Sequence, residues 1–209
     1  MELYHKINSI YKRDLKGKFM LGDWATPELA LLNEIQWEFT EKVDGTNIRV
    51  NYNGDTVGVG GRTNNAQLPM MLVDRLQMLL HPQKFKDHGF SDKITLYGEG
   101  YGHKIQKGGG NYVKGQKVVD FVLFDVKVGD WWLKRESVND VAKELGIQSV
   151  PVLGQGTLYN GIDIVKGGLQ STWGDFEAEG IVARPIVDLF SRNGSRIITK
   201  IKAKDFKCS

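Results

Sequence analysis

The amino-acid sequence predicts an α+β fold built on antiparallel β-sheets. Strand-like runs of alternating apolar and polar residues are frequent, and helical segments do not alternate regularly with them as they do in parallel sheets. Glycine is abundant, at 25 of 209 residues, while proline occurs only 5 times, which favours short strands joined by tight turns. The chain carries no internal repeat, and its length suits one sizeable domain.

The first predicted strands lie on either side of an Asp44-Gly45 turn. Apolar residues alternate with polar ones over residues 35–39 and again over residues 48–52, as in half-buried strands. Because the two runs flank a turn dipeptide, we expect them to form a hairpin-like pair. The stretch NYNGDTVGVGGRT, residues 51–63, then carries an Asn-Gly turn signal and a third short strand.

Two segments have the periodicity of amphipathic helices. Residues 69–82 carry an apolar stripe between two prolines, and residues 137–147 carry another. In the second segment Ser137 is the expected N-cap, with Asp140 three residues further on, and Gly146 is expected to end the helix. Further strands are predicted at residues 93–102, 118–128, 179–185 and 196–202, whereas residues 159–170 are ambiguous.

Composition and charge narrow the functional classes. The net charge of +3 is mildly basic, which would favour phosphate binding without proving it. No apolar run approaches the roughly 18 residues of a membrane span, and the first residues lack the apolar core of a secretory signal. We therefore expect a cytoplasmic protein with no membrane partner. The lone cysteine, Cys208, cannot form an internal disulfide, and with four scattered histidines it does not make a zinc site.

Several charged residues stand where predicted strands begin or end. Lys42 follows a strand and precedes a turn, and Lys200 and Lys202 project from one face of the last strand. Glu179 opens the strand before it. Taken alone, each of these residues could equally be an ordinary charged residue on the solvated surface. Asp125 is different, because it lies in an apolar run that should be buried, and a buried carboxylate needs a partner.

Together these residues suit phosphoryl transfer, which needs a nucleophile, cations around the phosphate and carboxylates that hold a metal ion. A lysine is a nucleophile only when neutral, so its pKa must fall from about 10.4. Nearby lysines would lower it by repulsion, and an apolar pocket would lower it by desolvation. Lys200 and Lys202 would supply the repulsion if their strand lies beside Lys42, and they would also offset the charge that grows on the phosphate.

Six short motifs resemble, in order, those of the covalent nucleotidyltransferases, the superfamily of polynucleotide ligases and mRNA capping enzymes. They span residues 41–202, most of the chain. Lys-x-Asp-Gly alone is weak evidence because chance matches are easy, whereas six motifs in one order are specific. The matching stretches are EKVDGTN for motif I, GGRT for the arginine motif that follows, LYGEGYG for motif III, FVLFDV for motif IIIa, EGIV for motif IV and TKIK for motif V.

Within the superfamily the chain is most similar to RNA ligases of the phage T4 RNA ligase 2 type. These carry Gly-Thr-Asn after motif I, as residues 45–47 do here, where DNA ligases and capping enzymes usually have an arginine at the position of Asn47. Asn47 is thereby placed in the nucleotide site, with a role at the nucleic-acid steps. The resemblance implies an ATP-grasp-like adenylylation domain of antiparallel sheets flanked by helices. It also implies ATP-dependent joining of 3′-hydroxyl and 5′-phosphate ends, as in nick sealing, through lysyl-AMP and an adenylylated 5′ end.

The resemblance assigns the catalytic and metal-binding roles by position. Lys42 would be the nucleophile that becomes bonded to AMP, and Lys200 and Lys202 would contact the α-phosphate. Glu179 would orient Mg²⁺ or Mn²⁺, directly or through water, as Mg²⁺ prefers. Asp44 would share that metal shell.

The same resemblance assigns the nucleotide-binding residues. Glu41 would meet the adenine edge through its backbone, and Glu99 would accept hydrogen bonds from the ribose. Phe124 would stack on adenine, with Asp125 bracing the pocket. Arg62 would bind the AMP phosphate or the 5′-phosphate end, a contact that suits a long planar cation.

The chain departs from many relatives after motif V, where it ends. We expect residues 1–209 to form a single adenylyltransferase domain, without the OB-fold or helical domain that follows in many relatives. RNA with paired or nicked ends would then be gripped by this domain, or with the help of an accessory protein. The loop of residues 102–115 offers glycines with Lys104 and Lys107 for that purpose, and a plain surface loop is the alternative.

Three other functions stay open. A small ATP-dependent DNA ligase would share the fold and the chemistry but act on DNA. A nucleic-acid-binding or nucleotide-sensing relative without turnover is the second, although the intact Lys42, Glu179, Lys200 and Lys202 argue against it. An mRNA guanylyltransferase is the third, weakened by Asn47 and by the lack of an OB domain.

Overall fold

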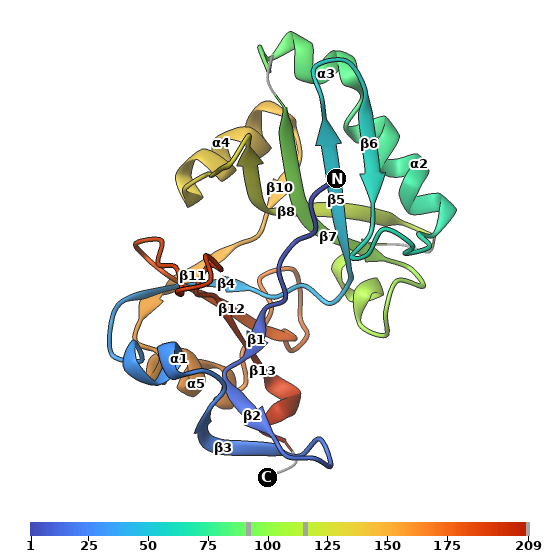
Figure 1. Ribbon diagram of the computed structural model, residues 1–209. Coiled ribbons are helices and arrows are strands. Elements are labelled where there is room, and N and C mark those ends of the chain that lie inside the picture. The colour runs from blue at the N-terminus through green and yellow to red at the C-terminus, as the bar shows by residue number, and fades with distance from the viewer. Residues whose placement is uncertain (91–92, 115–116, 208–209) are drawn as a thin grey trace. The chain divides into compact units, whose positions relative to one another are not determined.

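The computed structural model describes residues 1–90, 93–114 and 117–207 (Figure 1). Within these residues the α+β class is confirmed, because the helices are few and short and most strand pairs are antiparallel. None of the described helices is long and apolar enough to cross a membrane. Cys208, which the sequence excludes from an internal disulfide, lies outside the described residues.

The chain divides into two compact units with separate hydrophobic cores. Unit 1 comprises Met1–Tyr4 and Asp44–Val150, and unit 2 comprises His5–Val43 and Pro151–Ser209. One boundary between the units therefore runs through motif I. The expectation of a single domain over the whole chain stays a prediction.

Unit 1 is built on a six-stranded sheet in the order β10-β8-β7-β5-β6, with β9 paired to β8. Its neighbouring strands are antiparallel except for β10 and β8. The predicted Asn-Gly turn joins β5 to β6, and Gly54 adopts a φ of 97° there. The strands are β5 Thr46–Tyr52, β6 Val57–Gly60, β7 Ile94–Gly102, β8 Val119–Val128, β9 Trp131–Trp132 and β10 Gln148–Ser149.

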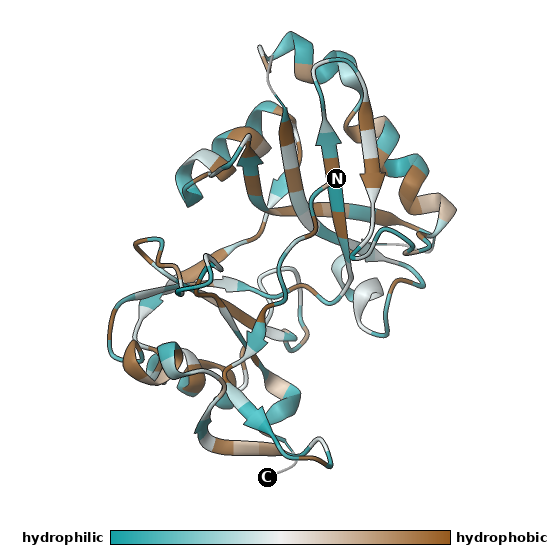
Figure 2. Cartoon of the chain, viewed as in Figure 1, coloured by the Kyte–Doolittle hydropathy of each residue, from teal (hydrophilic) through white to brown (hydrophobic). Residues whose placement is uncertain are grey.

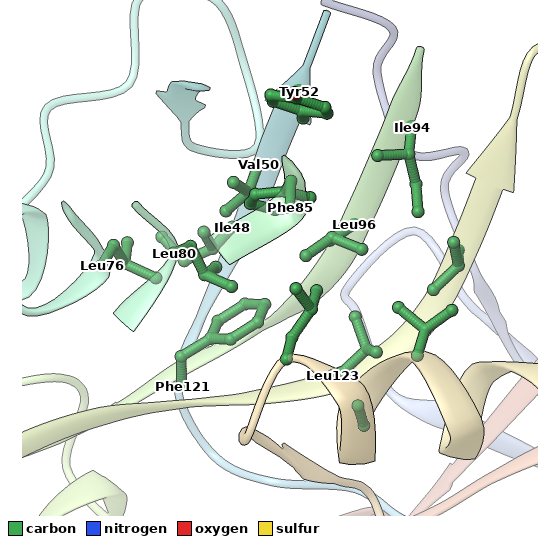
Figure 3. Close-up of a cluster of buried hydrophobic side chains, with 14 of the residues drawn as sticks. Ile48, Val50, Tyr52, Leu76, Leu80, Phe85, Ile94, Leu96, Phe121 and Leu123 are labelled. Carbon is green, nitrogen blue, oxygen red and sulfur yellow. The ribbon is translucent and has the colours of Figure 1, made fainter. Parts of the chain in front are cut away.

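One face of this sheet packs on the helices of unit 1. Ile48, Val50 and Tyr52 of β5 point into the core, where the Tyr52 ring stacks on Phe85 at a centroid distance of 4.6 Å (Figure 3). Hydrophobic and hydrophilic residues alternate along β5 (Figure 2), so the opposite face of this strand is polar. The helical elements are α2 Met70–Leu79, α3 Pro82–Asp87, the 3₁₀ turn η1 Gly109–Tyr112 and α4 Arg135–Glu144.

Helix α4 begins earlier than predicted. Lys134 occupies the N-cap position and no side chain caps the helix, so the prediction of Ser137 as N-cap is wrong. The earlier start keeps the predicted apolar stripe buried and places Glu136 in the first turn, where a negative charge is favourable. Gly146, with a φ of 57°, follows the end of the helix as predicted.

Unit 2 contains a five-stranded sheet in the order β1-β13-β12-β4-β11 and a separate two-stranded β2-β3 sheet. The β1–β13 pair is parallel and the other pairs are antiparallel. Strand β12 lies between β13 and β4, so segments far apart in sequence meet here. The strands are β1 Asn8–Ser9, β2 Tyr11–Arg13, β3 Phe19–Trp24, β4 Trp37–Glu41, β11 Val152–Gly156, β12 Gly180–Pro185 and β13 Thr199–Lys202.

Helix α5, Leu158–Lys166, accounts for the segment that was ambiguous in sequence. Thr157 and Asn160 form a capping box, in which each side chain binds the backbone of the other residue. Ile162 and Val165 are buried in the core of unit 2. The other helical elements of this unit are α1 Pro27–Leu31 and the 3₁₀ turn η2 Ala203–Asp205.

The predicted hairpin around Asp44-Gly45 is wrong. Strand β4 belongs to the sheet of unit 2 and β5 to the sheet of unit 1. Strand β5 pairs with β7 instead, with Thr46 opposite Gly100. A Cβ atom at Gly45 would lie 2.2 Å from the Gly100 carbonyl oxygen. Glycine is therefore required here because the backbone passes close to β7, and not because two strands turn back on each other.

Candidate active site

Lys42, Glu179 and Lys202, here called the Glu179 cluster, come together at the ends of adjacent strands of unit 2. Lys42 directly follows β4, and its backbone N–H donates to the Gly180 carbonyl at 2.9 Å. Glu179 directly precedes β12, and Lys202 ends β13 opposite Gly180. Because β12 pairs with both β4 and β13, it carries the carboxylate between the two lysines.

The Glu179 carboxylate bridges the two lysines. Lys42 Nζ donates to Oε2 at 2.7 Å, and Lys202 Nζ donates to Oε1 at 2.6 Å. The side chains of Lys42, Glu179 and Lys202 are only 20%, 15% and 18% exposed. Burial by itself raises the pKa of Glu179, but the two ammonium groups outweigh burial, so the pKa is lowered from its ordinary value of 4.5. The cluster thus holds an ionised carboxylate between two cations.

Gly180 is required for this arrangement. Its φ of 146° is a conformation that residues with side chains rarely adopt, and a Cβ atom there would lie 2.0 Å from the Ile201 carbonyl oxygen. Strand β12 can approach β13 this closely only because the position is glycine. The close approach sets Glu179 beside Lys202.

Lys200 lies on the same face of β13 as Lys202. Both are half-buried, whereas Thr199 and Ile201 are fully buried on the other face, which confirms the predicted alternation within this strand. The strand is shorter than predicted, because Arg196 lies outside it in an isolated bridge. Strand β13 is not adjacent to β4, because β12 lies between them. Lys42 and Lys202 are therefore connected through the carboxylate of Glu179.

The Glu41 side chain is buried and anchors a loop. Its Oε1 accepts a hydrogen bond from Ser171 Oγ at 2.5 Å, and its Oε2 accepts from the backbone N–H and the hydroxyl of Thr172. The Glu41 backbone N–H donates to the Pro151 carbonyl at 3.0 Å, so this donor is used within unit 2. These contacts fix the backbone immediately before Lys42. The contact of the Glu41 backbone with adenine stays a prediction.

In unit 1, Asn47 and Glu99 lie opposite each other on β5 and β7, on the sheet face away from the hydrophobic core. Asn47 Oδ1 is buried and has no hydrogen-bond partner among the described residues. A buried acceptor without a partner is costly, so a donor such as a ligand hydroxyl that reached Asn47 Oδ1 would stabilise this position. The structure therefore brings together two of the residues that were assigned to the nucleotide.

A β-bulge places Phe124. The register of β7 and β8 shifts here, which leaves Phe124 as the extra residue between Leu123 and Asp125. The half-buried Phe124 ring meets the Tyr4 ring edge-on, with 5.0 Å between centroids. Tyr4 Oη donates to Asp125 Oδ2 at 2.9 Å. A tyrosine from the N-terminal segment is therefore one partner of the buried carboxylate.

The residues that the six motifs assign fall within a match to a known protein family. The RNA ligase family model matches residues 35–202, most of the chain, and the match includes every residue that the six motifs assign. The chain belongs to the RNA ligase family. No curated protein matches the sequence.

Solved structures of the Naegleria gruberi RNA ligase share the fold of this RNA ligase family member. A mutant in the apo form gives a TM-score of 0.66 at 19% identity and covers 99% of this chain and 63% of its own. A mutant with ATP and Mn gives 0.65 at 19% identity, with 97% and 62% covered, and the ligase with PPi gives 0.65 at 19% identity, with 99% and 63% covered. The chain spans less than two thirds of the length of these ligases.

One buried residue of this RNA ligase family member was missed by the sequence analysis. Arg49 is 1% exposed, and its Nε–H donates to the Gly61 carbonyl at 2.6 Å. Its Nη1 donates to the carbonyls of Met1 and Glu2. Arg49 thereby holds the turn that carries Arg62, whose own side chain is exposed. In a strand of alternating residues, an arginine usually faces solvent. The only signal in the sequence that Arg49 is buried is its position at the centre of the strand.

Asp44 of motif I anchors the glycine-rich loop of residues 102–115, of which residue 115 lies outside the described residues. Asp44 Oδ2 accepts from the Gly108 backbone N–H at 2.9 Å, and the Asp44 backbone N–H donates to Tyr112 Oη at 3.3 Å. A Cβ atom at Gly108 would lie 2.6 Å from Asp44 Oδ2, so glycine permits this contact. The use of the loop to grip nucleic acid stays a prediction.

Few side chains of the described residues could bind a metal ion. No three His, Cys, Asp or Glu side chains in the described part of the chain are grouped to hold one. Mg²⁺ is commonly bound through one or two carboxylates together with substrate phosphates and water, and the ionised Glu179 fits that requirement. Glu179 and Asp44 lie in different units, so their sharing of a metal ion stays a prediction.

Proposed function

We propose that the protein is an ATP-dependent RNA ligase that joins 3′-hydroxyl and 5′-phosphate ends through a covalent lysyl-AMP intermediate. The observation that carries the proposal is the Glu179 cluster, in which Lys42 Nζ lies 2.7 Å from a carboxylate shared with Lys202. A nucleophile, a second cation and a carboxylate of the kind that binds metal ions suit phosphoryl transfer. Membership of the RNA ligase family supports RNA as the substrate.

In the first step Lys42 Nζ attacks the α-phosphorus of ATP. An N–P bond forms, the bond from the α-phosphorus to the bridging oxygen breaks, and its electron pair leaves with pyrophosphate. The amine must first lose a proton, because an ammonium group has no lone pair to donate. Lys42 donates to Glu179 Oε2 in the structure, so this proton passes to the carboxylate or to water before attack. Lys200 and Lys202 would stabilise the charge that grows on the α-phosphate.

Two further transfers complete the reaction. A 5′-phosphate oxygen attacks the α-phosphorus, the N–P bond breaks, and Lys42 regains its proton as it leaves. The 3′-hydroxyl then loses its proton and attacks the phosphorus at the 5′ end, and AMP leaves with the electron pair of the broken P–O bond. Base pairing to a complementary strand holds the two ends together, so nicked or duplex RNA is the proposed substrate.

Glu179 would hold Mg²⁺ or Mn²⁺, with Asp44 as a second carboxylate. Such an ion, when bound, adds positive charge beside the phosphate oxygens. Structures of Naegleria gruberi RNA ligase mutants with ATP and Mn and with AMP and Mn support a nucleotide and a divalent cation here. Each Glu179 oxygen accepts one hydrogen bond from a lysine in the structure, so each has a second lone pair that an ion or its bound water would use.

Residues of unit 1 would bind the nucleoside. Phe124 offers an aromatic ring for adenine, and Asp125 braces the strand beside it. Asn47 and Glu99 would bind ribose hydroxyls, which the buried and unpartnered Oδ1 of Asn47 supports. Arg62, exposed on its turn, would bind the AMP phosphate or the 5′-phosphate end.

The test of the proposal is transfer of label from α-labelled ATP to the protein in the presence of Mg²⁺. We expect label that survives denaturation, that acid releases and that Lys42→Ala abolishes. Lys12→Ala is the matched control, because Lys12 is an exposed lysine of unit 2 that pairs with Asp23, and it should be labelled normally. Label retained in Lys42→Ala would contradict the proposal, and label from GTP alone would move the assignment to mRNA capping.

The nature of the polynucleotide needs a separate assay. Matched nicks that carry RNA or DNA on the 3′-hydroxyl side are incubated with the protein, ATP and Mg²⁺, and the joined product is measured. We expect joining when the 3′-hydroxyl side is RNA. Joining confined to the DNA nick would support the small DNA ligase instead.

A further inference from the structure

A basic cavity of about 610 Å³ lies in unit 2, on the side of β13 that carries its two lysines. The β2–β3 hairpin, β13 and the turn η2, which are neighbours in Figure 1, contribute its walls. Five of its lining residues are cationic and one is acidic, so the cavity suits a compact polyanion. The lining residues are Ser9, Arg13, Gly17, Lys18, Phe19, Lys200, Lys202, Lys204 and Asp205.

Arg13 is held in place at this cavity by three contacts. Its Nη2 pairs with Asp205 Oδ1 at 2.5 Å, and its Nη1 donates to the Gly17 carbonyl at 3.0 Å. The guanidinium carbon lies 5.2 Å from the centroid of the Phe19 ring. A cation fixed in this way needs little reorganisation when it meets an anion.

Two exposed lysines of the cavity, Lys18 and Lys204, differ from Arg13 in this respect. Lys18 and Lys204 are exposed, and neither forms an ion pair with any residue in the part of the chain that the structure describes. Lys202 belongs to the cavity and also donates to Glu179 Oε1 at 2.6 Å. One lysine therefore connects the basic cavity to the Glu179 cluster that contains Lys42.

We propose that the basic cavity binds the β- and γ-phosphates of ATP and then the pyrophosphate released from it, with Arg13, Lys18 and Lys204 as binding residues outside the six motifs. The inference rests on the proposed attack of Lys42 on the α-phosphorus. When the bond to the bridging oxygen breaks, the electron pair stays with pyrophosphate, so negative charge grows on the leaving group. Cations in the cavity would stabilise that charge.

The cavity fits pyrophosphate better than a strand of RNA. Proteins that track single strands combine a basic groove with aromatic rings on which bases stack. Here the cations surround one concave cavity. Phe19 is only 8% exposed, and the Arg13 guanidinium lies over its ring. The lining thus offers charge without a stacking surface.

The test compares two reactions of the Lys18→Ala/Lys204→Ala double variant. Both side chains are exposed, so the fold is expected to persist, whereas replacing Arg13 would leave the buried Asp205 without its partner. The first reaction is lysyl-AMP formation from ATP, which releases pyrophosphate. The second is sealing of an RNA strand that already carries AMP at its 5′ end, which releases AMP alone. Lys12→Ala, on the same hairpin but outside the cavity lining, is the control.

We expect the double variant to form lysyl-AMP about tenfold more slowly at a fixed low ATP concentration, and to seal pre-adenylylated RNA at the rate of the control. An equal loss in both reactions would overturn the proposal in favour of an RNA phosphate site. No loss in either reaction would show that the cavity does not bind the leaving group.

Direct binding of inorganic pyrophosphate separates this inference from the proposed function. By calorimetry at fixed ionic strength, we expect the double variant to bind pyrophosphate about tenfold more weakly than the control, since tenfold corresponds to the loss of about 1.4 kcal/mol. If the wild type forms no lysyl-AMP, the proposed function fails, and this measurement still decides the ligand of the cavity. Equal affinity in the variant and the control would overturn the cavity assignment alone.

Discussion

The two units of the chain carry different kinds of candidate chemistry. In unit 2, Lys42, Glu179 and Lys202 form an ionic network in which each charge already has a partner. In unit 1, the assigned residues Asn47 and Phe124 are polar or aromatic, and the buried Oδ1 of Asn47 has no partner among the described residues. Charges at strand ends suit a phosphate, whereas an aromatic ring and an unused acceptor suit a nucleoside.

The difference indicates how each region responds to a ligand. A ligand at the Glu179 cluster meets charged groups that already form hydrogen bonds with one another, so it competes with contacts that the protein makes by itself. A ligand at Asn47 would add a hydrogen bond that the protein lacks. We therefore expect variants of the Glu179 cluster to change the rate of phosphoryl transfer and variants of Asn47 and Phe124 to change the affinity for the nucleotide.

The largest effect is expected from the lysines of β13. Lys202→Ala removes a cation that contacts Glu179 and faces the proposed phosphate, and Lys200→Ala removes its neighbour on the same face. Each should slow lysyl-AMP formation by about 10²–10³, the usual loss for one electrostatic contact in a transition state. Single-turnover labelling with α-labelled ATP measures the rate.

A lysine just beyond the strand controls for loss of charge. Lys207 is exposed and pairs with Glu177, so Lys207→Ala should form lysyl-AMP at the wild-type rate. A near-normal rate for Lys200→Ala would mean that this face of β13 does not contact the nucleotide. The expected difference between rate effects at the lysines and affinity effects at Asn47 and Phe124 would then not hold.

The buried arginine of unit 1 should have the next largest effect, and on stability. Arg49→Met leaves the Gly61 carbonyl without its donor and removes the hydrogen bonds to the carbonyls of Met1 and Glu2. An unpaired buried acceptor costs about 1–3 kcal/mol and each further hydrogen bond contributes about 1 kcal/mol, so we expect the free energy of unfolding to fall by about 3 kcal/mol. Urea denaturation measures the loss.

An exposed ion pair supplies the comparison for Arg49. Lys86→Ala breaks only the contact with the largely exposed Asp55 and should leave the free energy of unfolding almost unchanged. If Arg49→Met cost no more than Lys86→Ala, the buried hydrogen bonds of Arg49 would contribute no net stability. The turn that carries Arg62 would then be held by other contacts.

The strand faces were predictable because strand periodicity is local. Lys200 and Lys202 alternate with two buried residues, as the sequence indicated, and the apolar stripe of α4 is buried as expected. The pairing of strands was not predictable from the same pattern. The run before Asp44 alternates as well as the run after it, yet the two enter different sheets, because pairing depends on partners far away in sequence.

The surroundings of Phe124 show the same limit. Nothing in the sequence marks the bulge that makes this residue the extra one in β8, because a bulge is defined by the register of the neighbouring strand. The hydrogen bond from Tyr4 to Asp125 joins residues 121 positions apart. The sequence indicated that Asp125 needs a partner, but it could not identify which one.

A smaller effect is expected from Glu179→Gln, and it should depend on pH. Burial raises the pKa of Glu179, but Lys42 and Lys202 outweigh burial and lower it, so the ionised carboxylate stabilises the fold above the ordinary value of 4.5. This stabilisation is lost as pH falls through the lowered folded-state pKa. We expect Glu179→Gln to reduce the free energy of unfolding by about 2 kcal/mol at neutral pH. The difference from wild type should shrink in acid, and urea titrations over a pH series that found a constant difference would contradict the ionic account.

The smallest effect is expected from Phe124→Ala, and on affinity. Stacking of a base on an aromatic ring contributes about 1–3 kcal/mol, and the Phe124 ring already contacts Tyr4, so we expect the lower end of this range. The Kd for ATP should rise about tenfold, with little change in the rate at saturating ATP. Trp131→Ala, which removes an 80% exposed ring of the same unit, should change neither quantity. A fall in the saturating rate as large as that of Lys202→Ala would show that unit 1 also acts on the phosphoryl transfer itself, because an affinity contact alone is overcome by excess ATP.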